Sequence, residues 1–319
     1  MKPIIGLLLL CLFLCLPACS TTNKIISDSA TVSAKNDPLE SQYQQLLLDD
    51  DAAQEEVDGW IKEASAQEEN STARQTLNLR VKQRLDKTRS AYKEFLLKNP
   101  THARAHLAFG SFLNDIQEEE AAVDEWEKAK ELDPAGSASW NNLANHYGHR
   151  GPVKKAFEYY QKAIDLAPNE PLYYGNYATT VYLFRQDAQE FFKISEDQVF
   201  AKALDLYRAA IKLDPTNFVL ATDYAESFYG TKPPRYEEGL KAWNEALPKA
   251  RDAVEREGVL IHLARVNINL GKLEAAKTNL NLVQNQMYAQ LKTSLQRRIE
   301  KASTPEPGAE ERPDRPIQK

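Results

Sequence analysis

The sequence has little of what most enzymes and β-sheet proteins need. It contains 12 glycines among 319 residues and no sustained alternation of apolar and polar residues, which argues for an all-helical chain. The formal net charge of −6 is small, and the basic residues are dispersed among acidic ones. This pattern gives no indication of nucleic-acid binding.

Catalytic and metal-binding motifs are missing as well. We find no glycine-rich phosphate loop and no HExxH pattern. His102 and His106 are four residues apart, as metal ligands on a helix can be, but His106 falls on a core position and no third ligand is near. His146 and His149 are interpreted as a solvated pair. We therefore expect no catalytic residue, no metal and no cofactor, with an enzyme as a minor alternative.

The longest apolar run is at the start of the chain. One lysine precedes residues 4–16, which are too few for the roughly 20 residues of a membrane-spanning helix. A basic start, a short apolar core and small residues after it are typical of a secretory signal peptide. The only cysteine outside this segment is Cys19, because Cys11 and Cys15 lie within it. An exported chain cut after residue 18 would have no internal disulfide.

The residues Leu16-Pro17-Ala18-Cys19 resemble a bacterial lipobox. This resemblance implies that residues 1–18 are removed, that Cys19 carries acyl chains such as palmitate, and that the protein is a lipoprotein. Ser20 after the cysteine fits transfer to the outer membrane, facing the periplasm. The alternative is an ordinary cleaved signal that happens to contain a cysteine. Residues 19–38 are then the lipidated cysteine and a polar, flexible tether.

The stretch from Ser137 to Pro168 has the spacing of two antiparallel helices that pack together. Gly151 and Pro152 separate the two helices, and small residues alternate with large ones where the helices must approach. The positions that define the pattern are Trp140, Leu143, Ala144, Tyr147, Ala156, Tyr160, Ala163 and Pro168. They resemble a tetratricopeptide repeat. One such unit cannot bury its own apolar faces, so neighbouring units are required.

Neighbouring units are present at the same spacing. Pro100, Pro134 and Pro168 are 34 residues apart, and repeat-like positions continue to about residue 283. The resemblance implies an all-α, right-handed superhelical solenoid of antiparallel helix pairs over residues 39–302, clearest over 103–283. Helical caps are expected at both ends, and residues 303–319 are proline- and charge-rich, which predicts disorder.

Three further details of the solenoid are predicted. The acidic residues 49–51 should face water. Leu291, Leu295 and Ile299 should form the inner face of a C-terminal capping helix. Residues 184–199 are an insertion, because the next repeat proline comes 47 residues after Pro168 instead of 34. Phe191 and Phe192 in this insertion either pack under a lengthened helix pair or contact a partner.

By resemblance, the first helix of each unit lines a concave groove that binds an extended peptide or a helix. Asp223 and Glu226 there favour a neutral or basic partner segment. The cations of the carboxylate clamp found in some family members are missing, which argues against capture of a C-terminal carboxylate. The alternative is that these residues are merely solvated. The predicted groove residues are Asn141, Asn145, Asn176, Thr179, Tyr182, Thr222, Glu226 and Arg265.

The leading functional hypothesis is a membrane-anchored, non-enzymatic scaffold or assembly factor for a machine of the cell envelope. Its partners would be proteins, with the membrane contacted through Cys19. The alternative is a binder or sensor of cell-wall fragments or other small ligands, in which Tyr174, Tyr182 and Phe191 stack on ligand rings.

Overall fold

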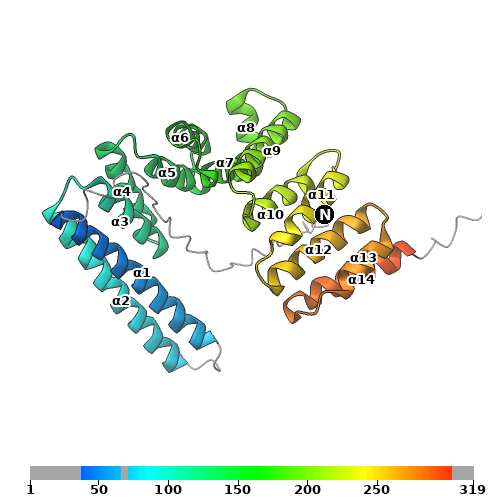
Figure 1. Ribbon diagram of the computed structural model, residues 1–319, viewed down its shortest axis with the longest axis horizontal. Helices are drawn as coiled ribbons and strands as arrows, with labels where there is room; N and C mark the ends of the chain where they lie inside the picture. The colour runs from blue at the N-terminus through cyan, green and yellow to red at the C-terminus, as the bar shows by residue number, and fades with distance from the viewer. Residues whose placement is uncertain (1–36, 66–70, 304–319) are drawn as a thin grey trace, which may run out of the picture. The chain divides into compact units, whose positions relative to one another are not determined.

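A computed structural model describes residues 37–65 and 71–303 of the chain. The predicted signal peptide, Cys19, most of the tether and nearly all of the predicted tail lie outside these residues. Within them the structure is helical and contains no strand. The predicted all-α solenoid of antiparallel helix pairs is confirmed (Figure 1). No helix of the described part combines the length and hydrophobicity that crossing a bilayer requires.

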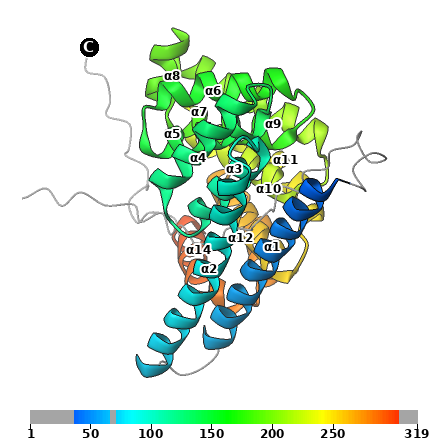
Figure 2. The same cartoon turned by 90° about the vertical axis from the view of Figure 1, so that its left-hand side faces the viewer.

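The chain divides into two compact units, residues 1–118 and 119–319. The described part of the first unit holds three helices, α1 (Pro38–Ser65), α2 (Ser71–Lys98) and α3 (Ala103–Asp115). α1 and α2 form a long hairpin, against one half of which α3 packs (Figure 2). Tyr92 of α2 is fully buried, and its ring stacks on Phe109 of α3 at 5.1 Å. Stacked aromatic rings thus join the hairpin to α3.

One residue of the acidic run in α1 differs from the prediction. Asp50 is half-buried, and its Oδ2 accepts a 2.6 Å hydrogen bond from the Tyr92 hydroxyl. Burial is the largest cause that raises the pKa of Asp50, to about 6. The prediction failed here because Asp50 is seven residues from both Tyr43 and Val57, which places all three on the buried face of α1. Asp49 and Asp51 are exposed, as predicted.

The second unit is built from successive antiparallel helix pairs. α5 pairs with α6, α7 with α9, α10 with α11 and α12 with α13, and each pair also contacts the next one. Its elements are α4 (Glu119–Leu132), α5 (Ser137–Arg150), α6 (Val153–Leu166), α7 (Pro171–Leu183), α8 (Arg185–Phe192), α9 (Glu196–Leu213), α10 (Phe218–Ser227), η2 (Phe228–Gly230), α11 (Tyr236–Ala246), η3 (Leu247–Lys249), α12 (Ala253–Asn269), α13 (Leu273–Asn281), η4 (Gln286–Tyr288) and α14 (Ala289–Ser303).

The pair α5–α6 has the packing that the repeat pattern predicts. Ala144, Ala156 and Ala163 are completely buried, so the two helix backbones approach closely where the side chains are small. Tyr160 is 2% exposed and fills the wider space between the helices. Trp140 is half-buried, and its indole Nε1 donates to the Pro134 carbonyl at 3.0 Å. The repeat proline therefore receives the hydrogen bond that the partly buried tryptophan needs.

The insertion between α7 and α9 folds as the short helix α8. Phe191 and Phe192 at its end are half-buried, and both rings contact Phe157 of α6, at 5.4 Å and 5.5 Å. Both therefore contribute to the apolar cluster around α6 and α7. Of the two alternatives for these rings, packing within the solenoid is the one that the structure supports. A partner contact through their exposed parts stays a prediction.

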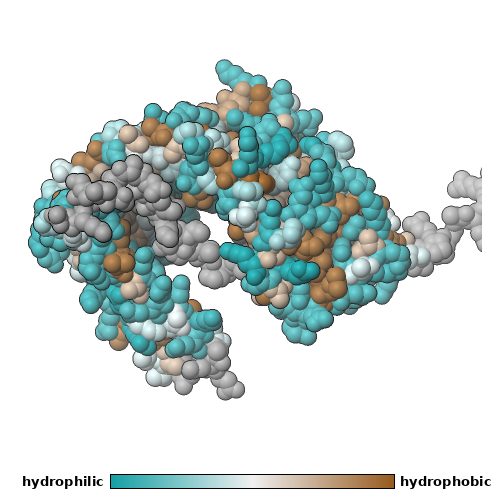
Figure 3. Space-filling model, in the orientation of Figure 1, coloured by the Kyte–Doolittle hydropathy of each residue, from teal (hydrophilic) through white to brown (hydrophobic). Residues whose placement is uncertain are grey.

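The C-terminal helix α14 covers the last pair with only part of the predicted face. Leu295 and Ile299 are 4% and 3% exposed, whereas Leu291, predicted to lie inward, is 42% exposed. Leu291 is in the first turn of α14, next to η4, where Met287 is also 51% exposed. The helix therefore buries Leu295 and Ile299 against the solenoid and leaves Leu291 outside the apolar contact. Hydrophilic residues otherwise cover most of the visible surface (Figure 3).

Candidate functional site

The predicted partner-binding residues lie on α5, α7, α10 and α12, the first helices of four successive pairs. We call their side chains the first-helix face. A hydrogen bond joins two of these helices directly, since Asn176 of α7 donates from Nδ2 to Oδ1 of Asn141 in α5 at 3.1 Å. The structure divides the face into two halves with different chemistry, one on α5 and α7 and the other on α10 and α12.

On α5, Asn141 is not available to a partner. Its side chain is 1% exposed, and its Oδ1 is occupied by the amide of Asn176. The prediction that Asn141 lines an open groove is therefore corrected. The reason is that α7 packs directly across it, so this asparagine bridges two helices of successive pairs. Asn176 itself is half-buried.

Asn145 and Thr179 are also engaged in hydrogen bonds within the chain. The hydroxyl of the buried Tyr160 donates to Asn145 Oδ1 at 2.7 Å. Thr179 Oγ1 lies 2.8 Å from the hydroxyl of Tyr207, which is 2% exposed. A buried tyrosine hydroxyl needs a partner. Asn145 and Thr179 therefore provide hydrogen-bond partners for buried tyrosines on the second helices of their own pairs. Only the exposed parts of the two side chains face outward.

Tyr182 and Thr222 are likewise used by the fold. The hydroxyl of Tyr182 lies so close to Gly230 that a Cβ on this glycine would be 2.5 Å from it. Burial raises the pKa of the Tyr182 hydroxyl. Thr222 Oγ1 donates to the Val219 carbonyl at 2.9 Å, which ties it to its own helix. Both side chains are half-buried.

The α10–α12 half carries charges instead. Asp223 is half-buried, and among the described residues its carboxylate accepts no hydrogen bond and forms no ion pair. Burial first, and the nearby Glu226 second, raise the pKa of Asp223 to about 7. Glu226 lies one turn further along α10 with 56% of its side chain exposed, and desolvation raises its pKa. Two neighbouring carboxylates without a cation between them would be stabilised by one.

Two aromatic residues that the sequence analysis did not select complete this half. The Tyr229 hydroxyl and His262 Nδ1 are 3.1 Å apart, and the His262 ring stacks on Trp243 at 4.1 Å. Burial lowers the pKa of His262 to about 3, so its 3.8 Å contact with Glu226 is not an ion pair at neutral pH. Tyr229 is three residues after Glu226, and His262 is three before Arg265. Helical spacing could therefore have found both.

Arg265 is the cation of the same surface. It is half-buried, and its guanidinium lies 5.9 Å from the centre of the Tyr229 ring. Its charge lowers the pKa of Glu226 without forming a close ion pair with it. We call Asp223, Glu226 and Arg265 the α10–α12 charged surface. It can hold a charged segment of a partner by complementary electrostatics, since it carries two carboxylates and one guanidinium.

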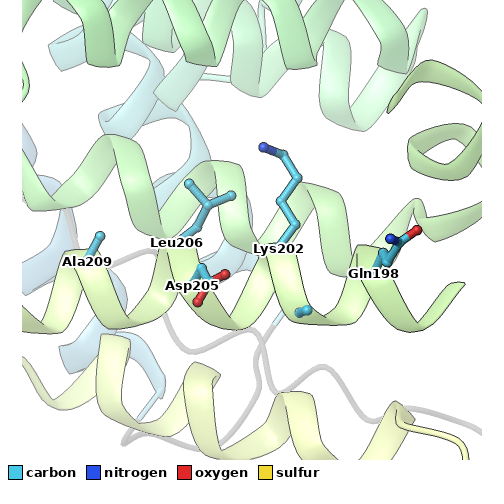
Figure 4. Close-up of a pocket in the computed structure, with 6 residues that line it drawn as sticks. Gln198, Lys202, Asp205, Leu206 and Ala209 are labelled. Atoms are coloured by element: carbon cyan, nitrogen blue, oxygen red, sulfur yellow. The ribbon is translucent and has the colours of Figure 1, made fainter. Parts of the chain in front are cut away.

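A shallow depression of about 380 Å³ lies along α9, after the insertion (Figure 4). Lys202 projects beside it, with its Nζ 4.6 Å from the centre of the Phe192 ring and 5.6 Å from that of Tyr177. Burial lowers the pKa of this lysine. Its contacts are those of a cation held by aromatic rings of its own chain. The lining residues are Gln198, Ala201, Lys202, Asp205, Leu206 and Ala209.

The histidines considered as metal ligands have structural contacts. His102 caps α3, where its Nδ1 accepts a 3.0 Å hydrogen bond from the backbone N–H of Ala105. His106 is 8% exposed, and its Nε2 lies 3.0 Å from the Pro100 carbonyl. Over residues 37–65 and 71–303, no group of three or more His, Cys, Asp or Glu side chains is arranged to hold a metal ion.

Comparison with known sequences agrees with the repeat geometry. Residues 137–170 match the tetratricopeptide repeat family. Over 150 residues the chain is 27% identical to the photosystem I assembly protein Ycf3 of Rippkaea orientalis (strain PCC 8801 / RF-1), which covers 44% of this chain and 87% of that protein. The chain therefore contains a tetratricopeptide repeat, within a solenoid of similar helix pairs.

Comparison with solved structures supports the same fold. The structure of PilW, a widely conserved type IV pilus biogenesis factor, is similar with a TM-score of 0.55 and 13% identity, covering 70% of this chain and 96% of that one. The structure of pilF from Pseudomonas aeruginosa is similar with a TM-score of 0.52 and 15% identity, covering 77% of this chain and 99% of that one. At these identities the likeness concerns the fold alone.

Proposed function

We propose that this protein is a membrane-tethered scaffold that recruits a protein partner through the α10–α12 charged surface. The observation that carries the proposal is the pair Asp223 and Glu226, which among the described residues have no Lys or Arg cation in ion-pair contact, in a solenoid whose other predicted contact residues are occupied internally. A basic partner segment would supply that cation. Assembly is also the role in the name of the Ycf3 relative.

The tether in this proposal is the lipidated Cys19, which would hold the helical body at the periplasmic face of the outer membrane. Its support is the lipobox-like sequence that ends at Cys19. Two or more acyl chains give far more stable anchoring than one. A scaffold fixed in this way meets membrane-bound partners at a high effective concentration, which suits an assembly factor of an envelope machine.

The test is crosslinking capture in native membranes with two isosteric substitutions. Asp223→Asn and Glu226→Gln remove the charges and keep the shapes of the side chains, and Glu245→Gln on the exposed side of α11 is the matched control. We expect wild type and Glu245→Gln to capture the same set of proteins, and the double variant to lose it. The same set with all three would contradict the proposal, provided that their helicity by circular dichroism is equal.

The structure gives no support to stacking of cell-wall fragments on the rings considered in the sequence. Tyr182 and Phe191 pack within the chain, against Phe200 and Phe157 respectively. The Tyr174 hydroxyl donates to the Pro168 carbonyl at 3.1 Å. All three aromatic side chains thus make contacts within the chain.

A further inference from the structure

Within the described part of the first unit, half of the α1–α2 hairpin is not covered by α3. The buried residues of α1 end at Val57, and those of α2 begin at Thr88. Beyond these two points no described side chain of the hairpin is buried, which leaves residues 58–65 and 72–87 as a free pair of helices (Figures 1 and 2). We call these residues the distal hairpin. Two helices alone rarely bury enough apolar surface to be stable.

A groove of about 490 Å³ runs between the two helices in the distal hairpin. Its wall includes the half-buried Trp60, over whose ring the Arg80 guanidinium lies at 3.8 Å. The half-buried Leu77 adds a second large apolar side chain. The lining residues are Trp60, Glu63, Ala64, Thr72, Ala73, Thr76, Leu77 and Arg80.

The groove opens on a different side of the hairpin from α3. In α1, Trp60 lies about 100° around the helix from Tyr43, whose hydroxyl donates to the Arg104 carbonyl in α3. In α2, Arg80 lies about 120° around the helix from Tyr92, which stacks on Phe109 of α3. A second layer of helices can therefore pack on the groove without displacing α3.

The two helices of the hairpin carry opposite charges. α1 has eight acidic residues and one basic residue, whereas α2 has eight basic residues and two acidic ones. Between residues 71 and 85, α2 contains basic residues and no acidic one. Asp49, Glu56 and Glu63 repeat every seven residues along α1, and Arg80 and Lys87 do so along α2. Seven-residue spacing keeps each row on one side of its helix, as in coiled coils.

These rows are only partly neutralised within the chain. Glu56 pairs with Arg84 at 2.9 Å, which also fixes the level at which the two helices meet. Trp60 lies four residues after Glu56, and Arg80 lies four residues before Arg84. The two antiparallel helices therefore keep the same register at both contacts. Among the described residues, Glu63 and Lys87 form no ion pair. Charges of opposite sign thus remain available on opposite helices of one hairpin.

We propose that the distal hairpin is the contact between two copies of this chain. A two-fold axis parallel to the helices places α1 of one copy over α2 of the other, and the reverse contact follows by symmetry. In this register Glu63 faces Arg80 of the second copy, within about one helical turn. Glu56, which lies two residues before the distal hairpin and is paired with Arg84 of its own chain, faces Lys87 of the second copy at a similar distance. Trp60 and Leu77 of both copies then fill the centre of an antiparallel four-helix bundle.

The charge pattern selects a second copy over an unrelated helix. One acidic and one basic helix, side by side, form a surface that is complementary to itself when rotated by this two-fold axis. A single helix of an unrelated partner would have to carry basic residues along the edge that faces α1 and acidic residues along the edge that faces α2. The distal hairpin is about 20 Å long and two helices wide, or roughly 400 Å² per copy, which is half of a standard interface. The dimer is therefore weak in solution and sensitive to salt.

The experiment is sedimentation of the purified full chain in nonionic detergent, with two charge-reversal variants. The first combines Glu56→Lys with Glu63→Lys, and the second combines Arg80→Glu with Lys87→Glu. Each variant alone brings like charges together, so we expect at least a tenfold weaker dimer at low salt. Mixing the two variants restores opposite charges at both contacts, and we expect the mixed dimer to form as wild type does.

The matched control reverses two exposed charges on other sides of the same helices, Glu55→Lys with Lys93→Glu. We expect this variant to dimerise as wild type does, and all variants to keep wild-type helicity. A wild-type chain that stays monomeric at 50 mM salt and several hundred micromolar would overturn the proposal. So would variants that dimerise as wild type does, or a mixture of folded variants that stays monomeric.

Discussion

Polar side chains on the first helices serve two purposes that their residue types do not reveal. Asn141 and Asn145 have the same chemistry, yet one bridges to α7 and the other accepts a hydrogen bond from the second helix of its own pair. Asp223, by contrast, has no partner among the described residues. A first-helix position therefore becomes a binding candidate only when its hydrogen-bonding capacity is not used inside the solenoid.

Asn145→Ala should destabilise the second unit by about 1–3 kcal/mol, because the hydroxyl of Tyr160 would lose its acceptor in a buried place. The measurement is a double-mutant cycle with Tyr160→Phe, by urea unfolding. We expect Asn145→Ala to cost much less when the hydroxyl has already been removed. Equal costs in both backgrounds would show that the hydrogen bond is not the reason for the loss.

Asp50→Asn should stabilise the first unit at neutral pH. The pKa of Asp50 is raised to about 6, so the folded state holds the proton more tightly than the unfolded chain does. The contribution of this carboxyl to stability is therefore fully present below about pH 4 and is lost as the pH rises through about 6. The amide removes that loss and still accepts from Tyr92, which predicts a gain on the order of 2 kcal/mol at pH 8.

The measurement for Asp50→Asn is hydrogen exchange of α1 and α2 at pH 5 and pH 8, corrected for the intrinsic exchange rate. Asp58→Asn, on the exposed side of the same helix, is the matched control. We expect protection to increase only for Asp50→Asn, and more at pH 8 than at pH 5. An equal gain at both pH values would assign the effect to something other than the titration of this carboxyl.

At the scale of elements, the two units use helices differently. In α5–α6 the alanines are completely buried and the helices touch along their length. In the hairpin α1–α2 the contacts with α3 end at about half its length, and the rest presents charge rows and a groove. Helix propensity thus matters most in the distal hairpin, where no third helix adds tertiary packing.

Two glycine substitutions test this difference in packing between the hairpin and the second unit. Gly59→Ala in α1 should stabilise the hairpin by about 0.5–1 kcal/mol, because a Cβ there meets no atom within 4 Å and alanine favours the helix. Gly175→Ala in α7 should destabilise the second unit, because its Cβ would be 2.5 Å from Cδ2 of the buried Leu220 in α10.

Thermal unfolding followed by circular dichroism measures both changes. Leu220→Ala combined with Gly175→Ala makes space for the new methyl group, so the pair should be less destabilising than the sum of the single changes. Additive losses would show that α7 and α10 do not meet closely at Gly175. A decrease in stability on Gly59→Ala would show that α1 needs the flexibility of glycine at this point.

At the scale of the whole molecule, the repeat pattern predicted the fold because it consists of local spacings. Small residues at fixed distances, such as Ala144 and Ala156, determine how two neighbouring helices approach, whatever the rest of the chain does. Asn141 and Leu291 were misplaced because their burial depends on how far the next helix extends over them. The stack of His262 on Trp243 joins α12 to α11, a contact between successive pairs that the spacing within one repeat does not contain.

The lipid anchor at Cys19 is a prediction at the scale of the whole molecule, because it determines at which membrane the folded body meets its partners. Cys19→Ala should abolish incorporation of palmitate and move the chain out of the membrane fraction, while the folded body keeps its helicity. The physical reason is that acyl chains contribute about 0.8 kcal/mol per buried methylene to membrane binding. Metabolic labelling with a palmitate analogue, followed by membrane fractionation, measures both effects.

The same substitution links the anchor to self-association. Chains tethered to one membrane meet at a much higher effective concentration than chains in solution, so a weak contact through the distal hairpin becomes populated there. Crosslinked dimers should therefore be abundant for the wild type in membranes and scarce for Cys19→Ala at equal expression. If the variant still incorporates the palmitate analogue, the lipobox interpretation is wrong. If it loses the label and yet remains in the membrane fraction, a second anchor holds the protein there.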